Sequence, residues 1–267
     1  MDIKDIKFMP KIKKTKPKTV IVTGGVHGIG RAIADSFLKS GNNVAIIDIL
    51  ESEGKEMESK NDHVYYINSD LTNNSTVPLV IDKVIDKFGN IDILINNAGF
   101  QYVSDLENFP DDMILKMINL MLISPILLSK YSLRNMVQNG WGRIINISSI
   151  HGLVASPYKT GYVVAKHGLI GLTRSIAIEY ALKGITCNAI APTYVKTSLV
   201  ESQIKKQAEY NKIKESDVIN KILMKDSPIK NLLRPEEVSS LVCYLCSDAA
   251  SSINGVVIPI DYGYTAK

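Results

Sequence analysis

The sequence predicts an α/β fold: a doubly wound, seven-stranded parallel sheet with helices on both faces. Two observations predict it. Short β-branched runs alternate with longer segments of helical periodicity, and most of the runs are apolar without interruption. Strands buried on both faces have this composition, and strict alternation of strands with helices indicates parallel strands. We therefore expect any ligand site beyond the carboxyl ends of the strands.

The predicted elements follow one another in a regular order. The strands are TVIVT (19–23), NVAIID (43–48), HVYYIN (63–68), IDILIN (91–96), RIINIS (143–148), ITCNAI (185–190) and GVVIPID (255–261). The helices are expected at 31–40, 75–88, 111–138, 162–182 and 235–247. Residues 18–267 show no internal repeat and no Pro/Gly linker, which indicates one domain. The polar segment at about 198–228 is placed to act as a substrate lid, and a simple surface insertion is the competing interpretation.

Composition limits the class of protein. The 267 residues are 45% hydrophobic, as expected of a globule with a sizeable core, and the net charge is +4. Much of that charge lies in a lysine-rich arm, predicted to be flexible, at 1–17, so the folded part is nearly neutral and nucleic-acid binding is not expected. We expect no membrane span in MINLMLISPILL (117–128), because it is short and because Asn119 and Pro125 should break it. A cytoplasmic enzyme or binding protein is the expectation.

Cysteine spacing offers a metal or redox interpretation that the rest of the sequence does not support. Cys243 and Cys246 form a C-x-x-C pair within a segment of helical periodicity, and Cys187 stands apart. No second pair or nearby histidine completes a tetrahedral set. We expect buried structural thiols and no metal.

A glycine-rich turn follows the first predicted strand. In TVIVTGGVHGIGRAIADSFL, Gly24, Gly28 and Gly30 lie where that strand passes into an amphipathic helix. Glycines there let backbone N–H groups approach a pyrophosphate at the helix N-terminus. Asp48 ends the second strand, where a carboxylate accepts hydrogen bonds from ribose hydroxyls and repels a 2′-phosphate. The sequence thus predicts a single-domain Rossmann fold that binds NAD rather than NADP.

A second pattern follows the fifth predicted strand. In SSIHGLVASPYKTGYVVAK, Tyr162 and Lys166 are spaced to share one face of a helix, and Ser148 and Ser149 come from the strand end. An ammonium close to a phenol favours the phenolate and lowers the pKa of the phenol. These residues predict a proton-transfer site.

Together these motifs resemble the short-chain dehydrogenase/reductase family along nearly the whole chain after the arm. TGGVHGIG resembles its cofactor turn, and NNAG (96–99) resembles its fourth-strand motif, which supports the sheet beside the cofactor. The resemblance implies that Tyr162 is the catalytic acid/base, that Lys166 lowers its pKa and holds the nicotinamide ribose, that Ser149 bonds the reacting oxygen, and that Asn119 anchors a water chain. The cofactor-binding set that it implies is Thr23, Gly24, His27, Gly28, Ile29, Gly30, Asp48, Asp70, Leu71, Asn97, Ala98, Gly99, Tyr162, Lys166, Pro192, Val195 and Thr197.

Within that family, the chain is most similar to the bacterial D-3-hydroxybutyrate dehydrogenases. The segments that carry this similarity are NNAGFQYV, SSIHGLVAS, YVVAKHGLIGLT, TCNAIAPTYVKTSLVESQI and DYGYTAK. The similarity implies interconversion of D-3-hydroxybutyrate and acetoacetate, and assembly into a homotetramer through the helices that contain Asn119 and Tyr162. Donors at one end of a pocket suit a small hydroxy acid. The substrate-binding set that it implies is Gln101, Ser149, His151, Lys159, Tyr162, Tyr194, Gln203 and Tyr264.

Four positions depart from the pattern of those dehydrogenases. PTY replaces their Pro-Gly-Trp and introduces Thr193 and Tyr194, Tyr264 replaces a tryptophan, and DYG replaces Asp-Gly-Gly. These changes alter the size and polarity of the pocket and leave its exact substrate open. A dehydrogenase of another short hydroxy acid, a 3-oxoacyl carrier-protein reductase and a non-catalytic NADH-sensing protein are the alternatives.

Overall fold

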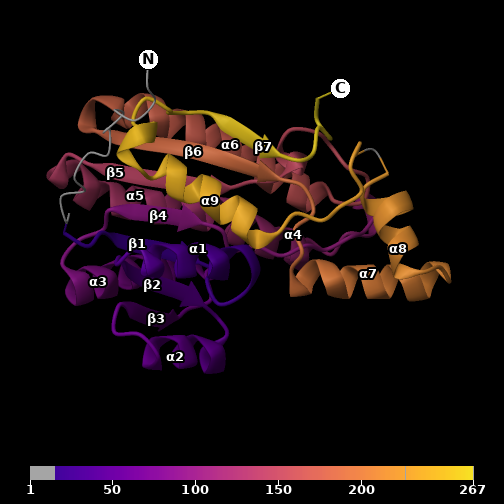
Figure 1. Ribbon diagram of the computed structural model, residues 1–267, viewed down its shortest axis with the longest axis horizontal. Coiled ribbons are helices and arrows are strands. Elements are labelled where there is room, and N and C mark those ends of the chain that lie inside the picture. The colour runs from indigo at the N-terminus through magenta and orange to yellow at the C-terminus, as the bar shows by residue number, and fades with distance from the viewer. Residues whose placement is uncertain (1–15, 226, 267) are drawn as a thin grey trace, which may run out of the picture.

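The computed structural model describes residues 16–225 and 227–266, so most of the predicted N-terminal arm lies outside the described residues. One sheet of seven parallel strands runs through its centre, in the order β3-β2-β1-β4-β5-β6-β7. β1 pairs with both β2 and β4, because the chain winds first to one side of β1 and then to the other. The predicted doubly wound topology is confirmed (Figure 1).

All seven predicted strands are present, and each observed end lies within two residues of the predicted one. The β-branched runs pair in register, for example Val20 with Val44 and Ile144 with Cys187. The strands are β1 (Thr19–Thr23), β2 (Asn43–Asp48), β3 (Val64–Asn68), β4 (Ile93–Asn96), β5 (Gly142–Ile147), β6 (Ile185–Pro192) and β7 (Val257–Ile260).

Helices cover both faces of the sheet. α1 and α9 pack against each other on one face, while α3, α5 and α6 lie on the other (Figure 1). The helices are α1 (Gly28–Lys39), α2 (Glu51–Ser59), α3 (Val77–Phe88), α4 (Asp111–Ile118), α5 (Ser124–Asn139), α6 (Thr160–Tyr180), α7 (Ser198–Asn211), α8 (Glu215–Asp217) and α9 (Pro235–Leu245).

The helix predicted at 111–138 is present, and neither Asn119 nor Pro125 interrupts the apolar run within it. A π-helical turn, Asn119–Ile123, joins α4 to α5 without interruption, and Pro125 falls in the first turn of α5. A change of hydrogen-bond pattern next to the proline accommodates its missing N–H. Among the described residues, the resulting helix 111–139 has the length and composition of a membrane span. It packs against β4, β5, α3 and α6, and a core helix of an α/β sandwich also meets that criterion.

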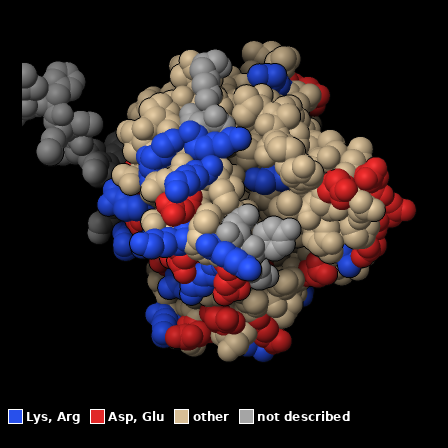
Figure 2. All heavy atoms as spheres, turned by 90° about the vertical axis from the view of Figure 1, so that its right-hand side faces the viewer, with Lys and Arg blue, Asp and Glu red and all other residues tan. Residues whose placement is uncertain are grey.

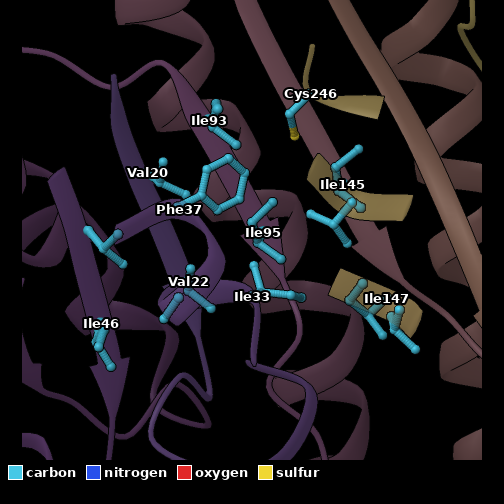
Figure 3. Packing of buried hydrophobic residues seen from close by; sticks show 14 of the residues in the cluster. Val20, Val22, Ile33, Phe37, Ile46, Ile93, Ile95, Ile145, Ile147 and Cys246 are labelled. Atoms are coloured by element: carbon cyan, nitrogen blue, oxygen red, sulfur yellow. The ribbon is translucent and has the colours of Figure 1, made fainter. Parts of the chain in front are cut away.

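Each face of the sheet has its own apolar core. Figure 3 shows the core under α1 and α9, where Ile33 and Phe37 of α1 lie over β-strand residues such as Val22 and Ile95. The core on the other face includes Leu94, Ile144 and residues of α3, α5 and α6. Because both faces are covered, the carboxyl-end edge of the sheet is left for polar side chains.

Candidate active site

The β1–α1 turn forms a close cradle. Gly28 has φ +56°, a left-handed conformation that favours glycine, and a Cβ at Gly30 would lie 2.0 Å from the Gly24 carbonyl oxygen. Asn97 Nδ2 donates to the carbonyls of Thr23 and Gly24 at 2.9 and 3.0 Å. The NNAG segment therefore ties the end of β4 to this turn, as the resemblance implied. Thr23 and Gly30 support the cradle from below: both are buried, and Thr23 Oγ1 accepts hydrogen bonds from the backbone of the NNAG segment.

A groove of about 560 Å³ runs from this turn along the carboxyl ends of β1, β2 and β3. Its size and its glycine floor fit the nucleotide part of a dinucleotide, since side chains at the glycines would fill the space. Ile47, Ile49, Leu50, Ser69 and Thr72 also line it and were not predicted. The predicted cofactor residues that line it are Gly24, His27, Gly28, Ile29, Asp48, Asp70, Leu71, Asn97, Ala98, Gly99 and Thr197.

Asp48 is held rigidly at the end of β2. Its Oδ2 accepts from the N–H of Val26 at 3.1 Å, and its Oδ1 accepts from the N–H groups of Ile49 and Leu50 at 2.8 and 3.2 Å. Tyr66 donates to the Asp48 carbonyl at 3.0 Å. A carboxylate oriented in this way faces the groove with remaining acceptor capacity for ribose hydroxyls.

A smaller cavity of about 150 Å³ adjoins the groove beyond β5 and β6, and it brings Ser149, Tyr162 and Lys166 together. Lys166 Nζ lies 5.5 Å from the centre of the Tyr162 ring and donates to the carbonyl of Ile147 at 2.7 Å. Pro192 and Val195 line the same cavity. Asn119 lies half-buried where α4 passes into the π-helical turn, and it does not line this cavity.

The charge states in this cavity are set mainly by burial. Burial raises the pKa of Tyr162 and outweighs the hydrogen bond with Ser149, which lowers it; nearby Tyr194 raises it further. Burial also lowers the pKa of Lys166 to about 8. In the protein alone, Tyr162 is therefore held as a phenol, which differs from the lowered pKa that the Tyr–Lys spacing predicted. Ser148 donates to the Lys166 carbonyl at 3.1 Å and so supports α6.

Of the predicted carboxylate-binding residues, Gln101, His151 and Gln203 line the cavity, whereas Lys159 does not line it and contacts the lining residues His151 and Tyr194. Lys159 is buried, and its Nζ donates to Tyr194 Oη at 3.1 Å and lies 3.4 Å from His151 Nε2. Burial lowers the pKa of Lys159 to about 8; burial and then the Lys159 charge lower that of His151 to about 4. Gln101 lines the same cavity, and its buried Nε2 has no hydrogen-bond partner among the described residues. At neutral pH Lys159 is therefore a cation, His151 is a neutral imidazole, and Gln101 offers an amide donor.

The segment after β6 supplies the remaining side of the cavity. Tyr194 and Gln203 line it, together with Thr193 and Val200, which were not predicted as site residues. Phe100 and Ile147 also line it, and both lie next to predicted motif residues. Tyr264 lies in the turn after β7, where its N–H donates to the Asp261 carbonyl at 3.0 Å, and it is not among the residues that line the cavity.

Comparison with known proteins agrees with this geometry. A family model described as enoyl-(acyl carrier protein) reductase matches residues 24–265. The chain is 41% identical over 258 residues to a D-beta-hydroxybutyrate dehydrogenase of Rhizobium meliloti (strain 1021), covering 94% of this chain and 99% of that protein. It is 34% identical over 254 residues to a D-beta-hydroxybutyrate dehydrogenase of Cupriavidus necator, covering 94% and 98%.

A solved structure described as ElxO with NADP bound superimposes with a TM-score of 0.84 and 32% sequence identity, covering 94% of this chain and all of that one. The matches extend over the glycine-rich turn, the Tyr–Lys pair and the segment after β6 alike. The chain belongs to the short-chain dehydrogenase/reductase family and is an oxidoreductase.

Proposed function

We propose that the protein is an NAD-dependent dehydrogenase that interconverts D-3-hydroxybutyrate and acetoacetate. One observation carries this proposal: the lining of the cavity divides into the proton-transfer residues Ser149 and Tyr162 and the polar side chains Gln101 and His151, and the buried Lys159 ammonium contacts His151 and Tyr194 of that lining. A substrate with a carboxylate at one end and a reacting oxygen near the other fits this division. The two relatives named D-beta-hydroxybutyrate dehydrogenase support the same substrate.

The protein's own groups move the proton. In the reduction, Tyr162 donates its phenolic proton to the carbonyl oxygen, and the raised pKa keeps that proton in place beforehand. In the oxidation, the phenolate takes the proton from the hydroxyl. Ser149 hydrogen-bonds the reacting oxygen in both states, and the Lys166 ammonium stabilises the phenolate. NAD, when bound, exchanges the hydride with the substrate carbon.

In this proposal Lys159, His151 and Gln101 bind the substrate carboxylate and so orient the substrate. The Lys159 ammonium forms a charge-assisted hydrogen bond to one carboxylate oxygen, and the Gln101 amide supplies a second donor. His151 is neutral, so it adds hydrogen bonding without adding charge. We propose that Gln203, which reaches the cavity from α7, completes this carboxylate site when substrate is present.

NAD is favoured over NADP by Asp48. The carboxylate stands at the end of β2 where the adenosine ribose would lie, and no lysine or arginine is among the described residues that line the groove. A 2′-phosphate would meet a negative charge there. Replacing Asp48 with Ala should lower the preference for NADH over NADPH, measured by fluorescence titration of both. An unchanged ratio would contradict this assignment.

The alternatives each lack one of these features. A carrier-protein reductase needs room for a long thioester, whereas the cavity that His151 and Gln101 line has a volume of only about 150 Å³. A non-catalytic NADH sensor has no need of a buried Ser-Tyr-Lys set. Another short hydroxy acid remains the nearest alternative, because Thr193 and Tyr194 reshape the pocket.

A substrate panel tests the proposal. Initial rates with NAD are measured for both enantiomers of 3-hydroxybutyrate, for shorter and longer hydroxy acids, and for methyl 3-hydroxybutyrate, which lacks the carboxylate charge. We expect the highest kcat/KM for D-3-hydroxybutyrate and a large loss for the methyl ester. Equal kcat/KM values for acid and ester would contradict a carboxylate-binding site, and higher activity with another acid would reassign the substrate.

A further inference from the structure

The segment between β6 and β7 is an excursion with a narrow base. The chain leaves the sheet after Val195 and returns at Leu233, and these two residues form an isolated parallel bridge. Lys196 N donates to the Leu233 carbonyl at 2.7 Å, and Leu233 N donates to the Tyr194 carbonyl at 2.9 Å. These backbone contacts close the base of the excursion, and Figure 1 shows α7 and α8 projecting beyond the sheet.

This excursion has its own small apolar cluster, formed within it by Ile204, Ala208, Val218, Leu223 and Met224. Two tyrosines from outside it pack against the cluster. Tyr194 comes from the end of β6, and Tyr262 comes from the turn after β7. Among the described residues assigned to the two clusters, Tyr262 alone also packs against the main core under α1 and α9. It therefore bridges the sheet and the excursion.

Tyr262 occupies a strained backbone conformation. Its φ is +54°, in the left-handed region that side chains with a Cβ adopt at a cost. Buried Asp261 imposes the conformation, since its carboxylate accepts from the N–H groups of Gly263 and Thr265 at 2.9 and 2.8 Å and from Thr265 Oγ1 at 2.6 Å. The tight turn that results aims the Tyr262 ring at the excursion. A Cβ at Gly263 would lie 3.7 Å from Pro228 Cγ, so the returning segment also rests against this turn.

We propose that Tyr262 is a positioning residue that docks residues 198–224 as a lid over the substrate cavity. Strain of this kind persists where surrounding structure over-determines it, and it gathers at functional sites. Val200 and Gln203 of α7 line the cavity, so the position of α7 determines whether the cavity is complete. The bridge at Val195 and Leu233 acts as the hinge, and the Tyr262 ring holds the far side of the lid.

Substitutions of Tyr262 distinguish the effect of its ring from the effect of its backbone strain. Asn and Gly accept the left-handed conformation and remove the ring, while Phe retains the ring and removes only the hydroxyl. For Tyr262→Asn and Tyr262→Gly, we expect KM for the hydroxy acid to rise about tenfold, because a lid docked only about one-tenth of the time weakens apparent binding by that factor. kcat should change less than KM. Tyr262→Phe should match the wild type.

Limited trypsin digestion gives a second readout that needs no substrate. The exposed lysines of the excursion, such as Lys205 and Lys212, should be cut several-fold faster in the Asn and Gly variants, with cleavage sites located by mass spectrometry. The proposal rests on the proposed function only for the KM readout. If the wild type fails to oxidise 3-hydroxybutyrate, the proposed substrate is wrong while the digestion still tests the lid.

The outcomes separate positioning from a merely structural role. A structural role lowers Tm in the Asn and Gly variants and leaves KM and the lid cleavage rate of the folded protein unchanged, and that result would overturn the proposal. So would a Phe variant that loses as much as the Asn variant. A rise in KM and faster cleavage confined to 198–228, at a Tm close to that of the wild type in either ring-less variant, would support it.

Discussion

Tyr162 is the residue on which the proposed chemistry depends most directly. It lies in the cavity beside Ser149 and Lys166, and burial keeps its phenol protonated. Tyr162→Phe removes the only atom that exchanges the proton, so kcat should fall by at least about 100-fold. NADH affinity, measured by fluorescence titration, should stay within about twofold, since the hydroxyl contributes little to a site of this extent. Tyr158→Phe, on an exposed side chain in the turn before α6, is the control, and a Tyr162→Phe variant with substantial turnover would exclude this proton-transfer role.

A substitution of Lys159 tests whether this residue binds the substrate carboxylate. Lys159→Met keeps a long apolar stem and removes the charge. We expect KM for acetoacetate to rise at least about tenfold, because a buried charge-assisted hydrogen bond is lost, while KM for an uncharged ketone such as 2-butanone changes little. Steady-state kinetics with both substrates measure the difference. A parallel rise in the two KM values would mean that Lys159 acts on the shape of the cavity and not on charge.

The same lysine predicts a pH dependence. Burial lowers its pKa from the ordinary 10.5 to about 8, so the ammonium is present below that pH and is lost above it. The groups that face it are His151, which is neutral above its pKa of about 4, and Tyr194, whose pKa burial raises to about 12. The ratio of KM for acetoacetate to KM for 2-butanone should be flat from pH 6 to 7 and rise above about pH 8. Lys166 has a similar pKa and affects both substrates, so the ratio isolates Lys159, and Lys159→Met should flatten it.

Residue identities could be predicted from the sequence better than residue environments. The glycine turn, Asp48 and the Tyr–Lys pair were recognisable because local spacing places each of them. The Lys159–Tyr194 hydrogen bond joins positions 35 residues apart, and no local pattern indicates it. The direction of the Tyr162 pKa shift depends on the burial of its side chain, which spacing alone does not reveal. Likewise, Thr193 and Val200 enter the cavity through tertiary packing.

At the scale of elements, buried strands were the most predictable part. Their β-branched runs are long and uniform, whereas α2 carries few apolar residues and was not predicted. The long helix at 111–138 was predicted, but the π-helical turn at Asn119 within it was not, because apolar periodicity does not reveal a local change of hydrogen-bond pattern. The packing of α4 and α5 against α6 and the sheet shows how the two helices continue through that turn.

The α2–β3 contact leads to a prediction about an element. Gly54 of α2 is buried against the Tyr66 ring, and a Cβ there would lie 2.1 Å from Tyr66 Cε2. Gly54→Ala should lower the free energy of unfolding by about 1–3 kcal/mol, because α2 or the ring must move. NADH affinity should also fall, since Tyr66 donates to the Asp48 carbonyl. Ser52→Ala on the exposed face of α2 is the control for urea unfolding and NADH titration, and equal stability of the two variants would contradict the packing.

At the scale of the whole molecule, the two sheet-face cores are covered, but the long helices retain exposed apolar side chains. Ile178 of α6 is 82% exposed, Leu182 just beyond it is 100% exposed, and Leu115 of α4 is 62% exposed. In Figure 2, basic side chains gather on the left of the face shown with acidic ones among them, and acidic side chains lie at its right. Ile178 and Leu182 are four residues apart at the end of α6, and exposed large apolar residues so placed suit a surface that association covers. We propose that the protein is a homotetramer that uses this surface.

Ile178→Glu tests the assembly. A carboxylate buried without a partner is costly, so the variant should dissociate at a micromolar concentration at which we expect the wild type to sediment as a tetramer. Glu179→Gln, on the neighbouring exposed position, should leave the sedimentation coefficient unchanged. NADH should still bind the dissociated variant, because the groove is formed by β1, β2 and β3 within one chain. Sedimentation velocity with both variants decides the point: a wild type that sediments as a monomer, or an Ile178→Glu variant that stays tetrameric, would show that this face of α6 is not an interface.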